Sequence, residues 1–161
     1  TLNISAVMNH SEALAKQYHD LIEGGNIAGV GFKEVLHDVT WQEATTQIGD
    51  CNTINTLVYH VQYYVKMVTK MLEEGQLEGN DAASFVHEPV TSKEAWETLL
   101  DNTWHEAKVF TKLVAQLPEK RLSEPFKVYG TYYRNLHGLI EHTYYHLGQM
   151  RLLKKLIRAN G

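Results

Sequence analysis

The chain has 161 residues, which is enough for one domain with a sizeable core and too few for two. Its hydrophobic content of 43% and charged content of 21% are ordinary for a soluble globular protein, and no apolar run approaches the roughly 20 residues of a membrane span. The net charge is -4 without a basic cluster, which argues against nucleic acid as a partner. We expect one soluble domain over residues 1–161 that binds neither nucleic acid nor a membrane.

The first helix is predicted from apolar side chains that recur about every 100° along the chain. They are Ile4, Val7, Leu14, Tyr18 and Leu21, and the glycines of the sequence EGGN at 23–26 end the helix. The following link, residues 24–52, is long. Within it, the sequence GFKEVLHDV predicts a short extra helical segment over one end of the molecule.

The second helix is predicted from about residue 53 to residue 74. Asp50, Asn52 or Thr53 is expected to cap its start, and Gly75 is expected to end it. Its apolar stripe consists of Ile54, Leu57, Val58, Val61, Val65, Val68 and Leu72. Cys51 stands just before this helix; a thiolate would be favoured there, but we interpret the residue as an inert small side chain.

Two further helices complete the predicted fold. The third opens with TSKE, in which Thr91 and Glu94 have the spacing of a capping box, and it ends before Pro118. Its inward residues are Trp96, Leu99, Leu100, Thr103, Ala107, Phe110 and Val114. The fourth runs from about residue 131 to 158, and the polar sequences EGNDAASFVHEP and EKRLSEPFKVYG are predicted loops. Together these elements predict an all-α, four-helix-bundle domain.

Two histidines stand in the predicted buried stripe of the fourth helix. His142 and His146 share their side of the helix with Leu139, Met150, Leu153 and Ile157. A buried neutral imidazole needs partners for both nitrogens, and an unsatisfied one costs about 1–3 kcal/mol. Because side chains four residues apart lie about 5–6 Å from each other at Cβ, both rings can bind one metal ion.

A third inward histidine is predicted on the second helix. His60 lies in a sector shared with Leu57, Tyr64, Met67 and Met71, whereas His105 of the third helix lies opposite Trp96 on the outer face. A single inward histidine is more often a core residue with its hydrogen bonds satisfied. A pair of histidines four residues apart, together with a third inward histidine, favours a metal site instead. Three imidazoles leave coordination positions open, which is typical of catalytic sites. Metal binding should weaken below about pH 6, where free imidazoles protonate.

Other side chains are secondary candidates. His10 lies near the first stripe and could be a fourth ligand, a support for a ligand or a capping residue; we favour a noncatalytic role. Gln149, one turn beyond His146, could orient a ligand or substrate, or simply pack between helices. Tyr64 or Tyr145 could reach a pocket. The remaining histidines are predicted on the surface or in loops: His19, His37, His87 and His137.

Other metal chemistries fit the sequence less well. A carboxylate-bridged di-iron bundle needs two Glu-x-x-His pairs, and only Glu34 and His37 have that spacing, in a predicted link. The zinc-protease pattern His-Glu-x-x-His is absent, because HTYYH has no glutamate between its histidines. The lone Cys51 fits a reducing compartment, and the first thirty residues show no secretory signal, so we expect a cytoplasmic protein.

The two histidine-bearing stretches resemble the DinB/YfiT-like proteins. The resemblance lies in NTINTLVYHVQYYV, which contains His60, and in LIEHTYYHLGQMRLL, which contains His142 and His146. It implies an up-down-down-up four-helix bundle, a divalent metal ion such as nickel, zinc or iron bound by those three histidines, and a homodimer. It does not imply DNA binding.

The resemblance also suggests an activity. Relatives include transferases that join a low-molecular-weight thiol to an electrophile, a thiol-dependent maleylpyruvate isomerase, and proteins described as hydrolases. We therefore expect a metal-dependent enzyme that activates a low-molecular-weight thiol cosubstrate or water against a small-molecule substrate. The alternatives are a noncatalytic metal-binding or stress-response protein and, more weakly, a metal-free bundle with a small-molecule pocket.

Overall fold

The computed structural model describes residues 7–160, which form helices and no strand, so the predicted all-α class is confirmed. The elements in chain order are α1 (His10–Glu23), α2 (Phe32–Leu36), α3 (Trp41–Thr45), α4 (Ile54–Glu74), the 3-10 helix η1 (Ala82–Phe85), α5 (Lys93–Gln116), the 3-10 helix η2 (Glu119–Ser123) and α6 (Tyr132–Asn160). None of the helices in this range combines the length and the apolar content needed to cross a membrane.

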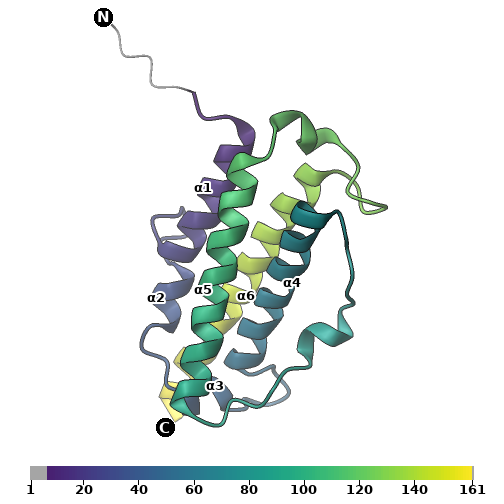
Figure 1. Cartoon of the computed structure of the whole chain (residues 1–161). Helices are drawn as coiled ribbons and strands as arrows, with labels where there is room; N and C mark the ends of the chain where they lie inside the picture. Colours follow the sequence, from purple (N-terminus) through teal and green to yellow (C-terminus); the bar gives the residue numbers. More distant parts are fainter. Residues whose placement is uncertain (1–6, 161) are drawn as a thin grey trace, which may run out of the picture.

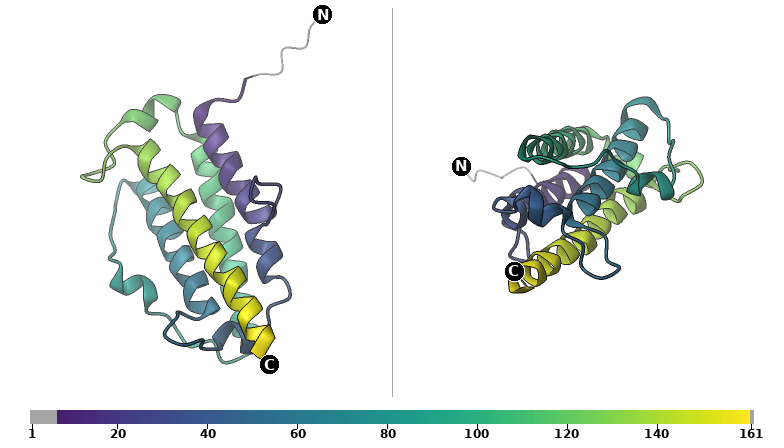
Figure 2. Two further views of the ribbon diagram at one scale, coloured as in Figure 1. Left: turned by 180° about the vertical axis from the view of Figure 1, so that it is seen from behind. Right: turned by 90° about the horizontal axis from the view of Figure 1, so that it is seen from below.

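The four long helices lie side by side (Figures 1 and 2). α1 and α4 each pack against both α5 and α6. Figure 1 shows that α4 and α5 run in one direction along the molecule, whereas α1 and α6 run in the opposite one. Each long helix contributes side chains to the core between them, including the buried Leu21, Val58, Phe110 and Met150. The described domain is therefore built around one apolar core.

The start of α1 differs from the prediction. Asn9 caps the helix: its side chain accepts from the backbone N–H of Glu12, whose own carboxylate accepts from the N–H of Asn9 (both 2.9 Å). This reciprocal pair starts the helix at His10, so Val7 precedes it and is 90% exposed rather than inward. The other residue predicted near this end, Ile4, lies outside the described residues.

The bounds of the other long helices agree closely with the prediction. Thr53 occupies the N-cap position of α4, but its hydroxyl donates to the Asn55 side chain (2.6 Å) and makes no capping hydrogen bond. Gly75 ends the helix with a φ of 68°, a left-handed conformation that glycine adopts without a steric penalty. At the start of α5 the predicted capping box is wrong by one residue. The cap is Ser92, whose side chain accepts from the N–H of Ala95 (3.2 Å), so Thr91 and Glu94 do not form the expected pair.

The link between α1 and α4 holds two short helices, where one segment was predicted. α2 coincides with that segment, but α3 was missed. Its signal was present, because Thr40 and Glu43 form a capping box: the Glu43 carboxylate accepts from the Thr40 N–H (2.8 Å), and Thr40 accepts from the Glu43 N–H (3.2 Å). The two predicted loops each contain one turn of 3-10 helix, η1 and η2.

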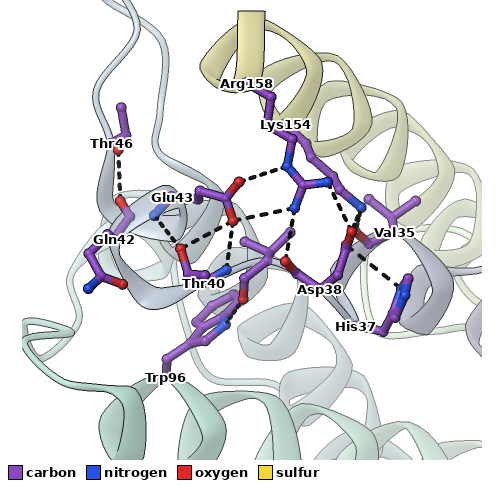
Figure 3. Close-up of polar contacts among 11 residues, drawn as sticks. Val35, His37, Asp38, Thr40, Gln42, Glu43, Thr46, Trp96, Lys154 and Arg158 are labelled. Atoms are coloured by element: carbon purple, nitrogen blue, oxygen red, sulfur yellow. Dashed lines mark hydrogen bonds and ion pairs between the residues drawn. The ribbon is translucent and has the colours of Figure 1, made fainter. Parts of the chain in front are cut away.

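Polar contacts tie this link to the end of α6 (Figure 3). Lys154 donates to the carbonyl of Val35 (2.7 Å) and pairs with Asp38, and Arg158 pairs with Asp38 (2.9 Å) and Glu43 (2.7 Å). Nearby, the indole N–H of Trp96 in α5 donates to the Val39 carbonyl (2.8 Å). α2 and α3 are therefore fastened to two of the long helices.

We expect Arg158→Gln to lower the free energy of unfolding by about 1 kcal/mol, because the change breaks two ion pairs that are partly exposed to solvent. Hydrogen bonds from Lys154 and Arg158 hold the pKa of Asp38 well below its usual range. A lowered carboxylate pKa stabilises the fold above the unfolded-state pKa, so the difference from the parent should shrink as the pH falls below about 4.

Urea unfolding at several pH values measures this effect. Arg151→Gln is the control, because Arg151 is exposed on the same helix and has no ion pair among residues 7–160. If both substitutions had equal effects at pH 7, the network would contribute nothing beyond ordinary surface charge.

Candidate metal centre

The three histidines predicted as metal ligands meet between α4 and α6. His60 comes from the first half of α4 and is 3% exposed. His146 comes from α6 and is 6% exposed, and His142, one turn before it, is half-buried. Nε2 of His142 lies 2.9 Å from Nε2 of His60 and 3.0 Å from Nε2 of His146. These three rings form the one group of potential metal ligands found among residues 7–160.

The protonation of His60 follows from its neighbours. Its Nδ1 lies 2.7 Å from the hydroxyl oxygen of Ser84, and that hydroxyl donates its own proton to the backbone carbonyl of Asp81. Ser84 must therefore accept, so Nδ1 of His60 carries the proton and donates it. In the neutral ring, Nε2 is then left with a bare lone pair that points toward the other two histidines.

The same reasoning applies to His146. Its Nδ1 lies 2.7 Å from Oε1 of Gln149, an amide oxygen that can only accept a hydrogen bond. Nδ1 therefore carries the proton and Nε2 presents a lone pair. Gln149, predicted to orient either a ligand or a substrate, contacts His146 and thereby orients that ring, which is the usual role of a residue behind a metal-binding histidine.

Two lone pairs thus converge on Nε2 of His142. If Nε2 of His142 carries a proton, it can donate that proton to the lone pair of only one neighbouring ring. The lone pair of the other ring is then left without a good hydrogen bond. A cation accepts all three lone pairs at once. Neighbouring nitrogens in a tetrahedral zinc site lie about 3.3 Å apart, given metal–nitrogen distances of about 2.0–2.1 Å. The observed separations of 2.9 and 3.0 Å are close to this value, so the residues fit a divalent ion.

The other nitrogen of His142 argues against an ordinary core histidine. Its Nδ1 is buried and has no hydrogen-bond partner among the described residues. An unsatisfied buried polar atom costs about 1–3 kcal/mol, and a core position filled by leucine would avoid that cost. The placement of His142 is therefore explained by what its Nε2 does, because the rest of the ring gains no hydrogen bond.

All three rings are neutral at pH 7. Burial, reinforced by the proximity of His146, lowers the pKa of both His60 and His142 to about 4, and burial also lowers the pKa of His146. The carboxylate of Asp81 acts in the opposite direction at each ring, because it favours positive charge there. The neutral form is the one that coordinates metal, so at physiological pH the rings are in the form that a metal ion requires.

The segment from residue 80 to 85 supplies the surroundings that sequence reasoning missed. The Asn80 side chain accepts from the N–H of Ala83 (2.9 Å) and starts the turn of η1, which places Ser84 behind His60 and stacks Phe85 on the His60 ring at 4.2 Å. Its only sequence signal was an asparagine three residues before the bonded N–H, within a stretch predicted as a loop.

A cavity of about 670 Å³ opens beside the histidines. His142 lines it, as do residues of α4, of the 75–81 link, and of the segment before α6. Tyr64 lies on its wall, edge-on to His60 and His142, and donates from its hydroxyl to Asp81 (2.8 Å). Burial and Asp81 raise the pKa of Tyr64 to about 12, so it stays protonated. Tyr145 is exposed instead and does not line the cavity.

The remaining candidates lie away from the centre. His10, considered as a fourth ligand, is the first residue of α1, is exposed and pairs with Glu119, so that possibility is wrong. His105 is exposed on α5, as predicted, and Cys51 is an exposed free thiol. Of the histidines predicted on the surface or in loops, His19 and His37 are exposed, whereas His87 and His137 are partly buried.

The burial of the rings changes the expected pH dependence of metal binding. Free imidazoles would compete with metal below about pH 6, but groups with a pKa of about 4 stay neutral to lower pH. We expect zinc affinity to change little from protonation of these rings between pH 7 and 5.5, and to fall steeply below about pH 5. Equilibrium dialysis against zinc at stepped pH, with circular dichroism to confirm folding, measures this. Loss of half the bound metal by pH 6 would contradict it.

Searches of protein-family models, curated proteins and solved structures find no match to this chain.

Proposed function

We propose that this protein is a DinB/YfiT-like, metal-dependent enzyme in which His60, His142 and His146 hold one divalent ion, with nickel, zinc and iron as the candidate metals. The observation that supports it most is the convergence of three Nε2 atoms at 2.9 and 3.0 Å, two of them with lone pairs exposed by Ser84 and Gln149. Three imidazoles suit each of these metals, so cellular supply contributes to the choice.

When bound, the ion supplies Lewis acidity, which lowers the pKa of a thiol or of water and makes the anion available at pH 7. Three protein ligands leave coordination positions open for the thiol or the water. Asp81 is the one carboxylate that lines the cavity within residues 7–160, and it is the proposed acceptor for the released proton. Tyr64 orients this carboxylate through its hydrogen bond to Oδ1.

A reaction is favoured over a purely structural or sensory role by two features. A noncatalytic metal-binding or stress-response protein would be indicated by a fourth protein ligand, and His10 does not reach the centre. The cavity beside His142 has room for a small-molecule substrate, since ligand pockets span about 300–1,000 Å³. The proposed reactions are transfer of a low-molecular-weight thiol to an electrophilic carbon and hydrolysis by activated water.

The helix arrangement supports the assignment to a DinB-like four-helix bundle. α1 and α6 run opposite to α4 and α5, which corresponds to an up-down-down-up order (Figure 1). The histidines occupy the second and fourth of the long helices, in the order that the family motifs have. This pattern, together with the sequences NTINTLVYHVQYYV and LIEHTYYHLGQMRLL, is the basis for the assignment.

We also propose a homodimer. Tyr145, Leu152 and Leu156 are exposed on α6, and their spacing places them on one face of the helix. Leu152→Asp should shift the protein from twice the chain mass to the chain mass, because a charge in an apolar interface is costly. Sedimentation measures the mass. Val86→Asp, at another exposed apolar residue, is the control, and a concentration-independent monomer of the parent would rule the dimer out.

The function is tested on protein purified without a metal-affinity tag. Elemental analysis identifies the bound ion, and the loaded protein is then assayed with a panel of thiols and electrophiles and, separately, with activated esters. We expect the loaded protein to accelerate thiol conjugation or ester hydrolysis over the reaction without protein. This acceleration should be lost in His60→Ala and kept in His105→Ala. Stoichiometric metal with neither activity across the panel would favour the noncatalytic alternative, and full activity in His60→Ala would disprove the assigned site.

A further inference from the structure

One charged side chain in the cavity has no role in the proposed metal centre. Arg134 lies on the cavity wall two turns before His142 on α6, and it is the one cationic side chain that lines the cavity in residues 7–160. Its partner is Glu141 (3.1 Å), but both side chains of this pair are largely exposed, so the ion pair is weak. The guanidinium is therefore available to an anion that enters the cavity.

The position of the guanidinium is set by Gly138. A Cβ at residue 138 would lie 3.0 Å from Nη1 of Arg134 and 3.9 Å from its Cζ, so the missing side chain lets the arginine lie along the helix toward His142. Gly138 precedes His142 by four residues, which corresponds to about 6 Å along the helix axis. The Arg134 and His142 side chains thus line the same cavity from one helix, α6.

Among the described residues that line the cavity, Asp81 is anionic and Arg134 is cationic. Asp81 contacts Tyr64 and favours positive charge on all three rings. In the metal-free protein an anionic group is therefore repelled by Asp81 and attracted by Arg134, whose planar fork of N–H donors matches a carboxylate. Apolar side chains, including Met67, Leu77 and Phe126, line the same cavity.

We propose that the cavity binds a small ligand with a carboxylate at Arg134 and its reacting atom beside the histidines. This proposal rests on the proposed function, because it names a substrate class for the same site. The carboxylate can belong to the thiol or to the electrophile, since both chemistries place a reactive atom beside the metal ligands. Glu141 competes with it for Arg134 and so tunes the affinity.

Two pairs of probes test this on the full chain, in metal-free and zinc-loaded form. They are 4-mercaptobutanoate and 5-oxohexanoate, each compared with its neutral primary amide, and dissociation constants come from NMR titration of the Gly79 and Gly138 amides. We expect at least one carboxylate to bind about tenfold or more tightly than its amide. If the thiol carries the carboxylate, the affinity ratio of carboxylate to amide should be larger for the thiol pair. If the electrophile carries it, the ratio should be larger for the carbonyl pair.

Variants locate the effect. Arg134→Gln should bring the ratio close to one, Glu141→Gln should raise it, and Arg151→Gln, at another exposed arginine of α6, should leave it unchanged. A ratio near one in the parent with both pairs, or an unchanged ratio in Arg134→Gln, would overturn the proposal. The metal-free arm separates this result from metal binding: failure to bind any ion would refute the proposed function, while the ratio in the metal-free protein would still decide the role of Arg134.

Discussion

His142→Ala should lose most of its bound divalent metal while its helices persist. Its Nε2 is the atom that both other rings approach, at 2.9 and 3.0 Å, so its removal leaves two ligands from separate helices. We expect the affinity for zinc to fall by more than about 100-fold, because changes to residues that merely support a ligand already cost about 10- to 100-fold. The apolar core is untouched, so the helical content should stay the same.

Equilibrium dialysis followed by elemental analysis measures this loss, and circular dichroism monitors the helices. His105→Ala is the matched control, since His105 also lies on a long helix but is exposed. It should bind one equivalent like the parent. A His142→Ala protein that retained a full equivalent of tightly bound ion would disprove the site, and the rings would then be core polar groups without an explanation.

Phe110→Ala should destabilise the protein by about 3–5 kcal/mol. Phe110 is 1% exposed on α5 and packs edge-on against Tyr18 of α1, with ring centroids 4.7 Å apart. The substitution removes buried apolar surface and leaves a cavity between two long helices that the surrounding side chains cannot fill completely. Most single substitutions cost less than about 3 kcal/mol, so this one should stand out in urea unfolding.

The control for this substitution is Ile27→Ala, at a fully exposed residue in the link after α1, which should change the free energy of unfolding by no more than about 0.5 kcal/mol. Under conditions where Phe110→Ala is still folded it should bind one equivalent of metal, because His60, His142 and His146 lie on α4 and α6. A loss below about 1 kcal/mol would mean that the α1–α5 contact is not a principal part of the core.

The long helices and the three histidines could be predicted from the order of residues along the chain. The apolar side chains of α4 recur with the helical period, and Gly75 ends it, so its bounds were predicted almost to the residue. The same periodicity showed that His60, His142 and His146 face inward while His105 faces out. The prediction was wrong at Thr91 and Ser92, where two neighbouring residues can both cap a helix.

The surroundings of the histidines depend on how distant segments pack and could not be predicted in this way. Ser84 lies 24 residues from His60 in sequence, and its hydrogen bond depends on the path of the 75–92 link, which no helical period describes. Arg134 and Asp81 share one cavity because α4, α6 and two links meet there, and His10 is excluded because α1 begins at the surface. Periodicity reports which way a side chain points from its own helix; partners on other segments depend on the packing of the whole chain, because those contacts are long-range.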